Sequence, residues 1–196
     1  MVCWFGFCVL CDFLRLEGLR VEVSQGRLDF GGRGGQGGGM AVPALYLDTS
    51  VIGGYFEEED LWQREPTREL WRLMELGIYR FVTSKVSAEE IILAPERVRT
   101  LFAATFPAEA ILPVTDEVKQ LATAYIRQGI LPEKCGADAR HVAACTVAGI
   151  ENLVSWNFKH LVNVERRRGF NGINLLHGHR NVSIVSPQEL VYGNRI

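Results

Sequence analysis

No apolar run in the 196-residue sequence approaches the roughly 20 residues that a membrane-spanning helix requires, so no membrane partner is expected. The charge is nearly balanced, with 21 basic and 23 acidic residues and a formal net charge of −2. This argues against non-specific binding of nucleic acid over a broad surface, so any such contact must use local basic patches. The five cysteines are odd in number and do not form the pattern of a disulfide framework. A reducing, cytoplasmic setting is therefore expected.

Two motifs of phosphate chemistry are also missing. The sequence contains no G-x4-G-K-[ST] loop, and the glycine run at 31–39 precedes no predicted helix and cannot replace one. An aspartyl nucleophile of the haloacid-dehalogenase type needs a second aspartate two residues after the first. The first candidate here is Asp48, and the place two residues later is occupied by Ser50. A nucleotide switch and an aspartyl-phosphate enzyme are both disfavoured.

The first forty residues differ in composition from the rest of the chain. Residues 30–39 read FGGRGGQGGG, which cannot bury enough apolar area to offset its backbone entropy. We predict that residues 1–40 are a disordered or spurious extension, with Met40 as the true initiator, and that residues 41–196 form a single domain. The spacing Cys3-x4-Cys8-x2-Cys11 matches part of an iron–sulfur pattern but lacks a fourth ligand.

Strand-like apolar runs alternate with helical patterns in the remainder, which is typical of βαβ units and a parallel sheet. We predict a three-layer α/β/α sandwich with a central, mostly parallel sheet of about five strands. The predicted strands are 44–48, 79–84, 110–114, 152–156 and 182–185. The predicted helices are 67–76, 86–94, 97–106, 118–128 and 138–150, with Pro95 separating the second from the third.

Acidic and amide residues fall where such a sheet binds ligands, beyond the carboxyl ends of its strands. Asp48 closes the first strand, Glu90 follows the second by about two turns, Asp138 opens a helix, and Asn157 follows the fourth strand. Each also has a purely structural explanation: a helix cap for Asp48, a capping box with Ser87 for Glu90, a helix dipole for Asp138 and a turn for Asn157. Four such coincidences on one edge of a sheet are much less common than one.

Three neighbouring carboxylates are costly unless a cation neutralises them, because like charges raise one another's pKa. Hard divalent cations take oxygen ligands, and Mg²⁺ binds one or two carboxylates while keeping several waters. Such a centre stabilises the attacking and leaving oxygens of a phosphodiester displacement. The pattern therefore predicts a metal site made by Asp48, Asp138 and Glu90, with Asn157 as a fourth catalytic candidate.

The ordered motifs LDTS, S-x5-E-I, DARHVA and SWNFKH resemble the PIN domain, and among its members the VapC-like toxins. The resemblance spans nearly all of residues 44–186. It implies a Mg²⁺- or Mn²⁺-dependent endoribonuclease for single-stranded RNA, a homodimer, and a small antitoxin partner. Asp48, Glu90 and Asp138 match the family's acidic positions, and Thr49 or Ser50 matches a hydroxyl that supports the first aspartate.

One position departs from the family pattern, because Asn157 stands where a fourth aspartate is usual. An amide carries no charge, so the change should weaken a second metal more than the first. A PIN-like module that binds RNA or protein without cleaving it is therefore the alternative prediction. His141, three residues after Asp138, shares its helical face and is given no catalytic role.

Further candidates lie outside the acidic set. Lys159 could face a phosphate backbone, and Arg166, Arg167 and Arg168 are predicted to form a basic substrate-binding loop with the glycines that follow. Four apolar residues could be core or could form a groove for an antitoxin helix: Leu61, Trp62, Leu70 and Trp71.

Overall fold

The computed structural model of the protein describes residues 20–24, 27–31 and 41–193. The chain forms two compact units, Met1–Gly39 and Met40–Ile196. In the first unit, β1 (Arg20–Ser24) pairs antiparallel with β2 (Arg27–Gly31). Residues 32–39 and the cysteine triplet at 3, 8 and 11 lie outside the described residues. That residues 1–40 are a disordered or spurious extension stays a prediction.

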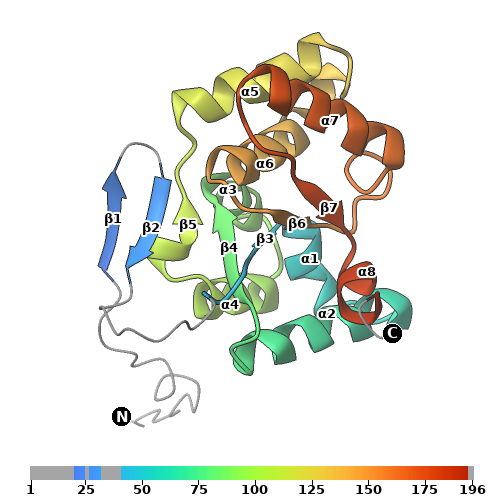
Figure 1. Cartoon of the computed structure of the whole chain (residues 1–196). Helices are drawn as coiled ribbons and strands as arrows, with labels where there is room; N and C mark the ends of the chain where they lie inside the picture. Colours follow the sequence, from blue (N-terminus) through green and yellow to red (C-terminus); the bar gives the residue numbers. More distant parts are fainter. Residues whose placement is uncertain (1–19, 25–26, 32–40, 194–196) are drawn as a thin grey trace, which may run out of the picture. The chain divides into compact units, whose positions relative to one another are not determined.

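A five-stranded, entirely parallel sheet forms the centre of the second unit (Figure 1). Its order is β5-β4-β3-β6-β7, so the chain starts at the central strand, builds one side of the sheet and then returns to build the other. The strands are β3 (Ala44–Leu47), β4 (Arg80–Ser84), β5 (Ile111–Leu112), β6 (Asn152–Val154) and β7 (Ser183–Val185). The order reverses between β3 and β6, and that junction is where open parallel sheets bind ligands.

Helices cover both faces of this sheet, as predicted, and complete three layers (Figure 1). The α-helices of the second unit are α1 (Thr49–Gly54), α2 (Leu61–Glu75), α3 (Lys85–Ile91), α4 (Glu96–Thr105), α5 (Asp116–Arg127), α6 (Gly136–Val147), α7 (Val164–Leu176) and α8 (Pro187–Tyr192). Two short 3₁₀ turns, η1 (Ala108–Ala110) and η2 (Glu133–Cys135), precede β5 and α6. In the part of the chain that the structure describes, no helix has the length and apolarity to cross a membrane.

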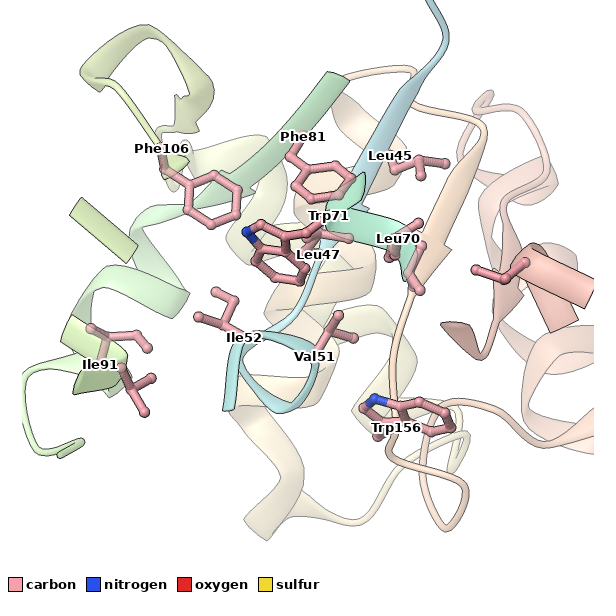
Figure 2. Close-up of a cluster of buried hydrophobic side chains, with 13 residues drawn as sticks. Leu45, Leu47, Val51, Ile52, Leu70, Trp71, Phe81, Ile91, Phe106 and Trp156 are labelled. Carbon is pink, nitrogen blue, oxygen red and sulfur yellow. The ribbon is translucent and has the colours of Figure 1, made fainter. Parts of the chain in front are cut away.

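Alternation along β3 divides its side chains between the two layers. Leu45 and Leu47 enter a buried cluster with Trp71 of α2 and Phe81 of β4 (Figure 2). Tyr46, between them, points to the opposite face, where its hydroxyl lies 2.8 Å from Nδ1 of a histidine on α6. The strand therefore anchors a hydrophobic core on one face and a polar chain on the other.

Several local predictions are corrected by the structure. The helix predicted at 67–76 begins at Leu61, where Asp60 caps it, in spite of Pro66. The basic loop predicted at 166–172 is wrong: these residues lie within α7, which begins after an Asn163 cap. Two glycines in RRRGFNG suggested a loop, but Phe170 and Ile173 are buried at helical spacing, and the Phe170 ring packs against Tyr125 of α5.

Gly54 sits at the end of α1, and its missing side chain gives room to Trp156. A Cβ at this position would lie 3.0 Å from the indole nitrogen of Trp156 and 3.3 Å from the hydroxyl of Thr67. Those two atoms also share a 2.9 Å hydrogen bond. We expect Gly54→Ala to lower the free energy of unfolding in urea by about 1–3 kcal/mol, because the crowding displaces a buried ring.

The adjacent Gly53 is the matched control. It lies in the same helix and is exposed, and a Cβ there meets nothing within 4 Å. Gly53→Ala should leave stability unchanged or raise it by roughly 0.5–1 kcal/mol through helix propensity. Equal effects of the two substitutions would show that contact with Trp156 does not limit residue 54.

Candidate active site at the β3–β6 junction

Asp48 occupies the junction between β3 and β6 and is only 4% exposed. Its backbone N–H continues the pairing by donating to the carbonyl of Val154, at 3.3 Å. Its side chain caps α1 through the backbone N–H of Val51, so the capping explanation is correct. Capping uses only one of the hydrogen bonds that Asp48 can accept, because an ionised carboxylate has about four acceptor sites.

Two hydroxyls take further positions on this carboxylate. Ser50 donates to Oδ1 at 2.6 Å, and Ser155, just beyond β6, donates to Oδ2 at 2.6 Å. Burial raises the pKa of Asp48, while His141 and the hydroxyl donors act in the opposite direction. The ionised form is thus solvated by the protein's own donors, with room on Oδ2 for one more ligand.

His141 interacts with all three predicted carboxylates, although the sequence analysis gave it no catalytic role. It lies on α6 and is 2% exposed. Its Nε2 is 3.2 Å from Oε2 of Glu90, and its ring also attracts the charges of Asp48 and Asp138. One buried imidazole therefore lies among the three carboxylates that the pattern predicted.

Hydrogen bonding determines which nitrogen of this imidazole carries the proton when the ring is neutral. The Glu90 carboxylate can only accept, so Nε2 carries a proton. In the neutral ring Nδ1 then accepts from the Tyr46 hydroxyl, whose oxygen lies 2.7 Å from the hydroxyl of Ser84 at the end of β4. This chain links the ends of β3 and β4 to α6 beneath the site.

Glu90 lies in the last turn of α3, with its side chain 37% exposed. The capping box predicted with Ser87 is wrong, because Ser84 caps α3 and Ser87 instead bonds Thr83. Thr49 donates to the same oxygen of Glu90 that faces His141. The bond to His141 lowers the pKa of Glu90, which keeps its charge at neutral pH and suits it to bind a cation rather than to accept a proton.

Asn157 connects Asp48 to Asp138. Its backbone N–H donates to Ser155, which itself bonds Asp48, and its side-chain amide donates to Oδ1 of Asp138 at 3.1 Å. Its amide oxygen accepts from the backbone N–H of His160 at 3.0 Å, so the turn explanation is also correct. Asn157 thus supplies Asp138 with a donor that an aspartate could not provide.

Asp138 lies in the first turn of α6 and is half-buried. Burial raises its pKa, opposed by His160 and His141. Among the described residues, one set of three His, Cys, Asp or Glu side chains has its ligand atoms within 4.8 Å of one another, and it is Cys135, Asp138 and His160. Asp48, Glu90 and Asp138 do not form such a set among the described residues, and Mg²⁺ does not require one because it binds one or two carboxylates directly and keeps several waters.

The basic candidates are separated by the fold. Lys159 is exposed in the turn after β6, and its charge acts on Cys135 beside the site. Arg166 donates to the Gly129 carbonyl at 3.5 Å, Arg167 pairs with Glu189 at 3.3 Å, and Arg168 pairs with Glu165 at 3.4 Å. Each arginine of α7 therefore has a partner within the protein, and a role for the three in substrate binding stays a prediction.

The four apolar candidates for a docking groove differ in exposure. Leu70 and Trp71 are core, at 0% and 4% exposure, so they cannot form a docking groove. Leu61 and Trp62 remain about half exposed. The Trp62 ring packs beside Trp156 and Phe158, at centroid distances of 5.2 and 5.7 Å, directly next to Asn157.

No model of a known protein family and no curated protein matches the chain. Among solved structures, the chain is similar to one of VapBC2 from Rickettsia felis bound to a DNA fragment from their promoter. The two are 12% identical, with a TM-score of 0.44 over 73% of this chain and 98% of that one.

Asp48→Asn should stabilise the metal-free protein at neutral pH. Because burial raises the pKa of Asp48 above its ordinary value of 3.8, the folded protein binds more protons than the unfolded chain between that value and the raised one. Stability from this group is present below that window and is lost as pH rises through it. The neutral amide avoids this loss, so urea unfolding at pH 7 should show a higher free energy of unfolding than the parent, and the gain should be absent below the window.

Asp116→Asn is the matched control. Asp116 is exposed at the start of α5 and pairs with Lys119, so its neutralisation should cost a few tenths of a kcal/mol rather than stabilise. Loss of stability in Asp48→Asn at pH 7 would show that the buried charge is already fully compensated.

Asn157→Asp should destabilise the metal-free protein, in contrast to Asp48→Asn. It replaces the amide donor to Asp138 with a second carboxylate at about the same place, so the metal-free protein should lose about 1–3 kcal/mol. Excess Mn²⁺ should recover much of this loss by neutralising the pair. The measurement is urea unfolding with chelator and with Mn²⁺.

Asn163→Asp provides the comparison, since residue 163 caps α7 at the surface and aspartate caps equally well. It should change stability by less than about 0.5 kcal/mol with or without metal. If Mn²⁺ does not restore the stability that Asn157→Asp loses, no cation binds near Asp138.

Proposed function

We propose that the protein is a divalent-metal-dependent endoribonuclease that cleaves single-stranded RNA with Mg²⁺ or Mn²⁺. One observation carries the proposal: Asp48, Glu90 and Asp138 surround one buried histidine at the switch point of a parallel sheet. The resemblance of the sequence motifs to the PIN domain supports the same reaction.

The residues present fit a hard cation. Asp48 has an unfilled acceptor position on Oδ2, and the two bonds to Glu90 both use Oε2. Asp138 accepts from the amide of Asn157 and from the thiol of Cys135, which is two of the about four positions that a carboxylate offers. Each carboxylate therefore keeps an acceptor position for a ligand. When bound, the cation would polarise the scissile phosphate and lower the pKa of a water.

The chain's own groups hold this arrangement in place. Ser50, Ser155 and the α1 N-terminus favour the ionised form of Asp48 against its burial, and His141 and Thr49 keep Glu90 oriented. Attack of water in line on phosphorus would break the bond to the 3′ oxygen, leaving a 5′-phosphate and a 3′-hydroxyl. Because Asn157 neutralises part of the charge on Asp138 by hydrogen bonding, we propose one tightly held cation rather than two.

The aromatic rings beside the site favour a single-stranded substrate. Trp62 is 47% exposed and Phe158 is 42% exposed, and Phe158 immediately follows Asn157. Unpaired bases stack on exposed aromatic rings, whereas a duplex hides its base faces. Lys159, in the same turn, is placed to meet the phosphate backbone.

As in the family it resembles, we propose that the chain acts as a homodimeric toxin in the cytoplasm and is held inactive by a small antitoxin protein. The exposed part of the early helical region, Leu61 and Trp62, is one exposed apolar surface that such a partner could cover. The same rings would then serve either RNA or antitoxin, so binding of one would exclude the other.

The test is cleavage of labelled single-stranded RNA by the full chain, freed of any co-purified protein, with Mn²⁺ or Mg²⁺ and with chelator. Asp48→Asn and Asp138→Asn should each lower the rate by about a hundredfold or more, since several kcal/mol of charge stabilisation depend on the cation they hold. Chelator should have the same effect, and the products should carry 5′-phosphates.

Asp116→Asn, at the exposed start of α5, is the control and should cleave as the parent does. The alternative is a PIN-like module that binds RNA without cleaving it. It would be established if the protein binds RNA but does not cleave it, and if neither Asp48→Asn nor chelator changes the binding.

A further inference from the structure

A sulfur ligand lies beside the oxygen-rich site. Cys135 ends η2 immediately before α6, is 8% exposed, and hydrogen-bonds Asp138 three residues later. His160 reaches the same place from the turn after β6. One ligand atom from each of Cys135, Asp138 and His160 lies within 4.8 Å of the other two.

The histidine of this cluster has an unmet bonding requirement. Nδ1 of His160 is buried and has no hydrogen-bond partner among the described residues. Buried polar atoms in folded proteins are nearly always paired, and an exception calls for a missing partner. Imidazole nitrogens are among the commonest metal ligands, and a bound cation orients and satisfies the ring.

The ligand types select the cation. A thiolate, an imidazole and a carboxylate form a tetrahedral Zn²⁺ site with one open position, whereas Mg²⁺ and Ca²⁺ prefer oxygen alone. The thiolate and the Asp138 carboxylate together carry two negative charges, which balance a divalent cation. Closing the atoms to a zinc geometry needs side-chain movements of about 1 Å.

We propose that Cys135, Asp138 and His160 form a Zn²⁺ site that overlaps the candidate active site through Asp138. As the metal binds, the Cys135 thiol forms a bond to it and releases its proton to solvent. Burial and the neighbouring Asp138 charge raise the pKa of Cys135 in the metal-free protein, and a cation placed between the two groups reverses that effect.

Sharing of Asp138 has a functional consequence, which rests on the proposed nuclease activity. A Zn²⁺ ion held by Cys135 and His160 withdraws the Asp138 carboxylate from the hard cation that Asp48 and Glu90 would help to bind. Zinc is then an inhibitor of the Mg²⁺- or Mn²⁺-dependent reaction, acting within the site.

The first experiment measures binding without activity. Co²⁺, which replaces Zn²⁺ and gives a thiolate-to-metal charge-transfer band in the near ultraviolet, is titrated into the full chain with its thiols reduced. The parent should show the band at one equivalent, and Zn²⁺ should displace it. Cys135→Ser should abolish it, and His160→Gln should weaken Co²⁺ affinity at least about tenfold.

Two controls locate the thiolate. Cys145→Ser removes the other described cysteine, which is buried in α6 and bonds the Ile150 carbonyl, and the band should remain. Joint replacement of Cys3, Cys8 and Cys11 by Ser should also keep it. Far-ultraviolet circular dichroism of each variant checks that it is folded. No band in the parent, or a band that persists in folded Cys135→Ser, would overturn the proposal.

The second experiment separates this site from the proposed function. With RNA and Mn²⁺, one equivalent of Zn²⁺ should slow the parent about tenfold or more, and Cys135→Ser should respond less than about twofold. A cobalt band at Cys135 without any cleavage would keep the zinc site and reject the nuclease. Cleavage that Zn²⁺ leaves unchanged, in a protein that shows the band, would reject the inhibitory role.

Discussion

The buried carboxylate of Asp48 is the constraint on which the rest of the site depends. An ionised group at 4% exposure persists only if the protein replaces its hydration shell. The replacement comes from the first turn of α1 and from Ser155 beyond β6, so the charge joins two strands that are distant in sequence. A change in the β3–β6 pairing would remove the Ser155 donor and leave the carboxylate with those of α1 alone.

His141 interacts with all three carboxylates of the site. Its bond to Glu90 lowers the pKa of that carboxyl, whereas burial raises the pKa values of Asp48 and Asp138 and His141 only opposes that rise. The hydroxyls of Tyr46 and Ser84 complete the chain below it. The site has the character expected of functional centres, where stability is reduced locally in order to hold charges together.

Hydrogen bonding and metal binding are alternative ways to relieve Asp138. Asn157 supplies an amide donor on one side, and Cys135 and His160 offer a soft-metal environment on the other. An aspartate in place of Asn157 would set a second negative charge beside Asp138, whereas the amide adds none. The site is therefore consistent with a single hard cation and with sensitivity to zinc.

Much of the fold was readable from the sequence because it depends on local rules. Alternating apolar runs and helical stripes placed five parallel strands between two helical layers, and strand ends marked Asp48 and Asn157. Errors arose where tertiary contacts override local signals. Gly169 and Gly172 suggested a loop, yet burial of Phe170 makes the segment helical. Strand positions are set by periodicity, but a glycine's effect depends on what packs around it.

The partners of each side chain were decided only by the tertiary structure. The sequence by itself determined that carboxylates follow strand ends, and therefore that they gather at one rim of the sheet. It did not reveal that Ser155 bonds Asp48, that Thr49 supports Glu90 rather than Asp48, or that Cys135 faces His160. Those pairings join residues far apart in the chain, and their geometry depends on strand order and helix packing, which no local pattern specifies.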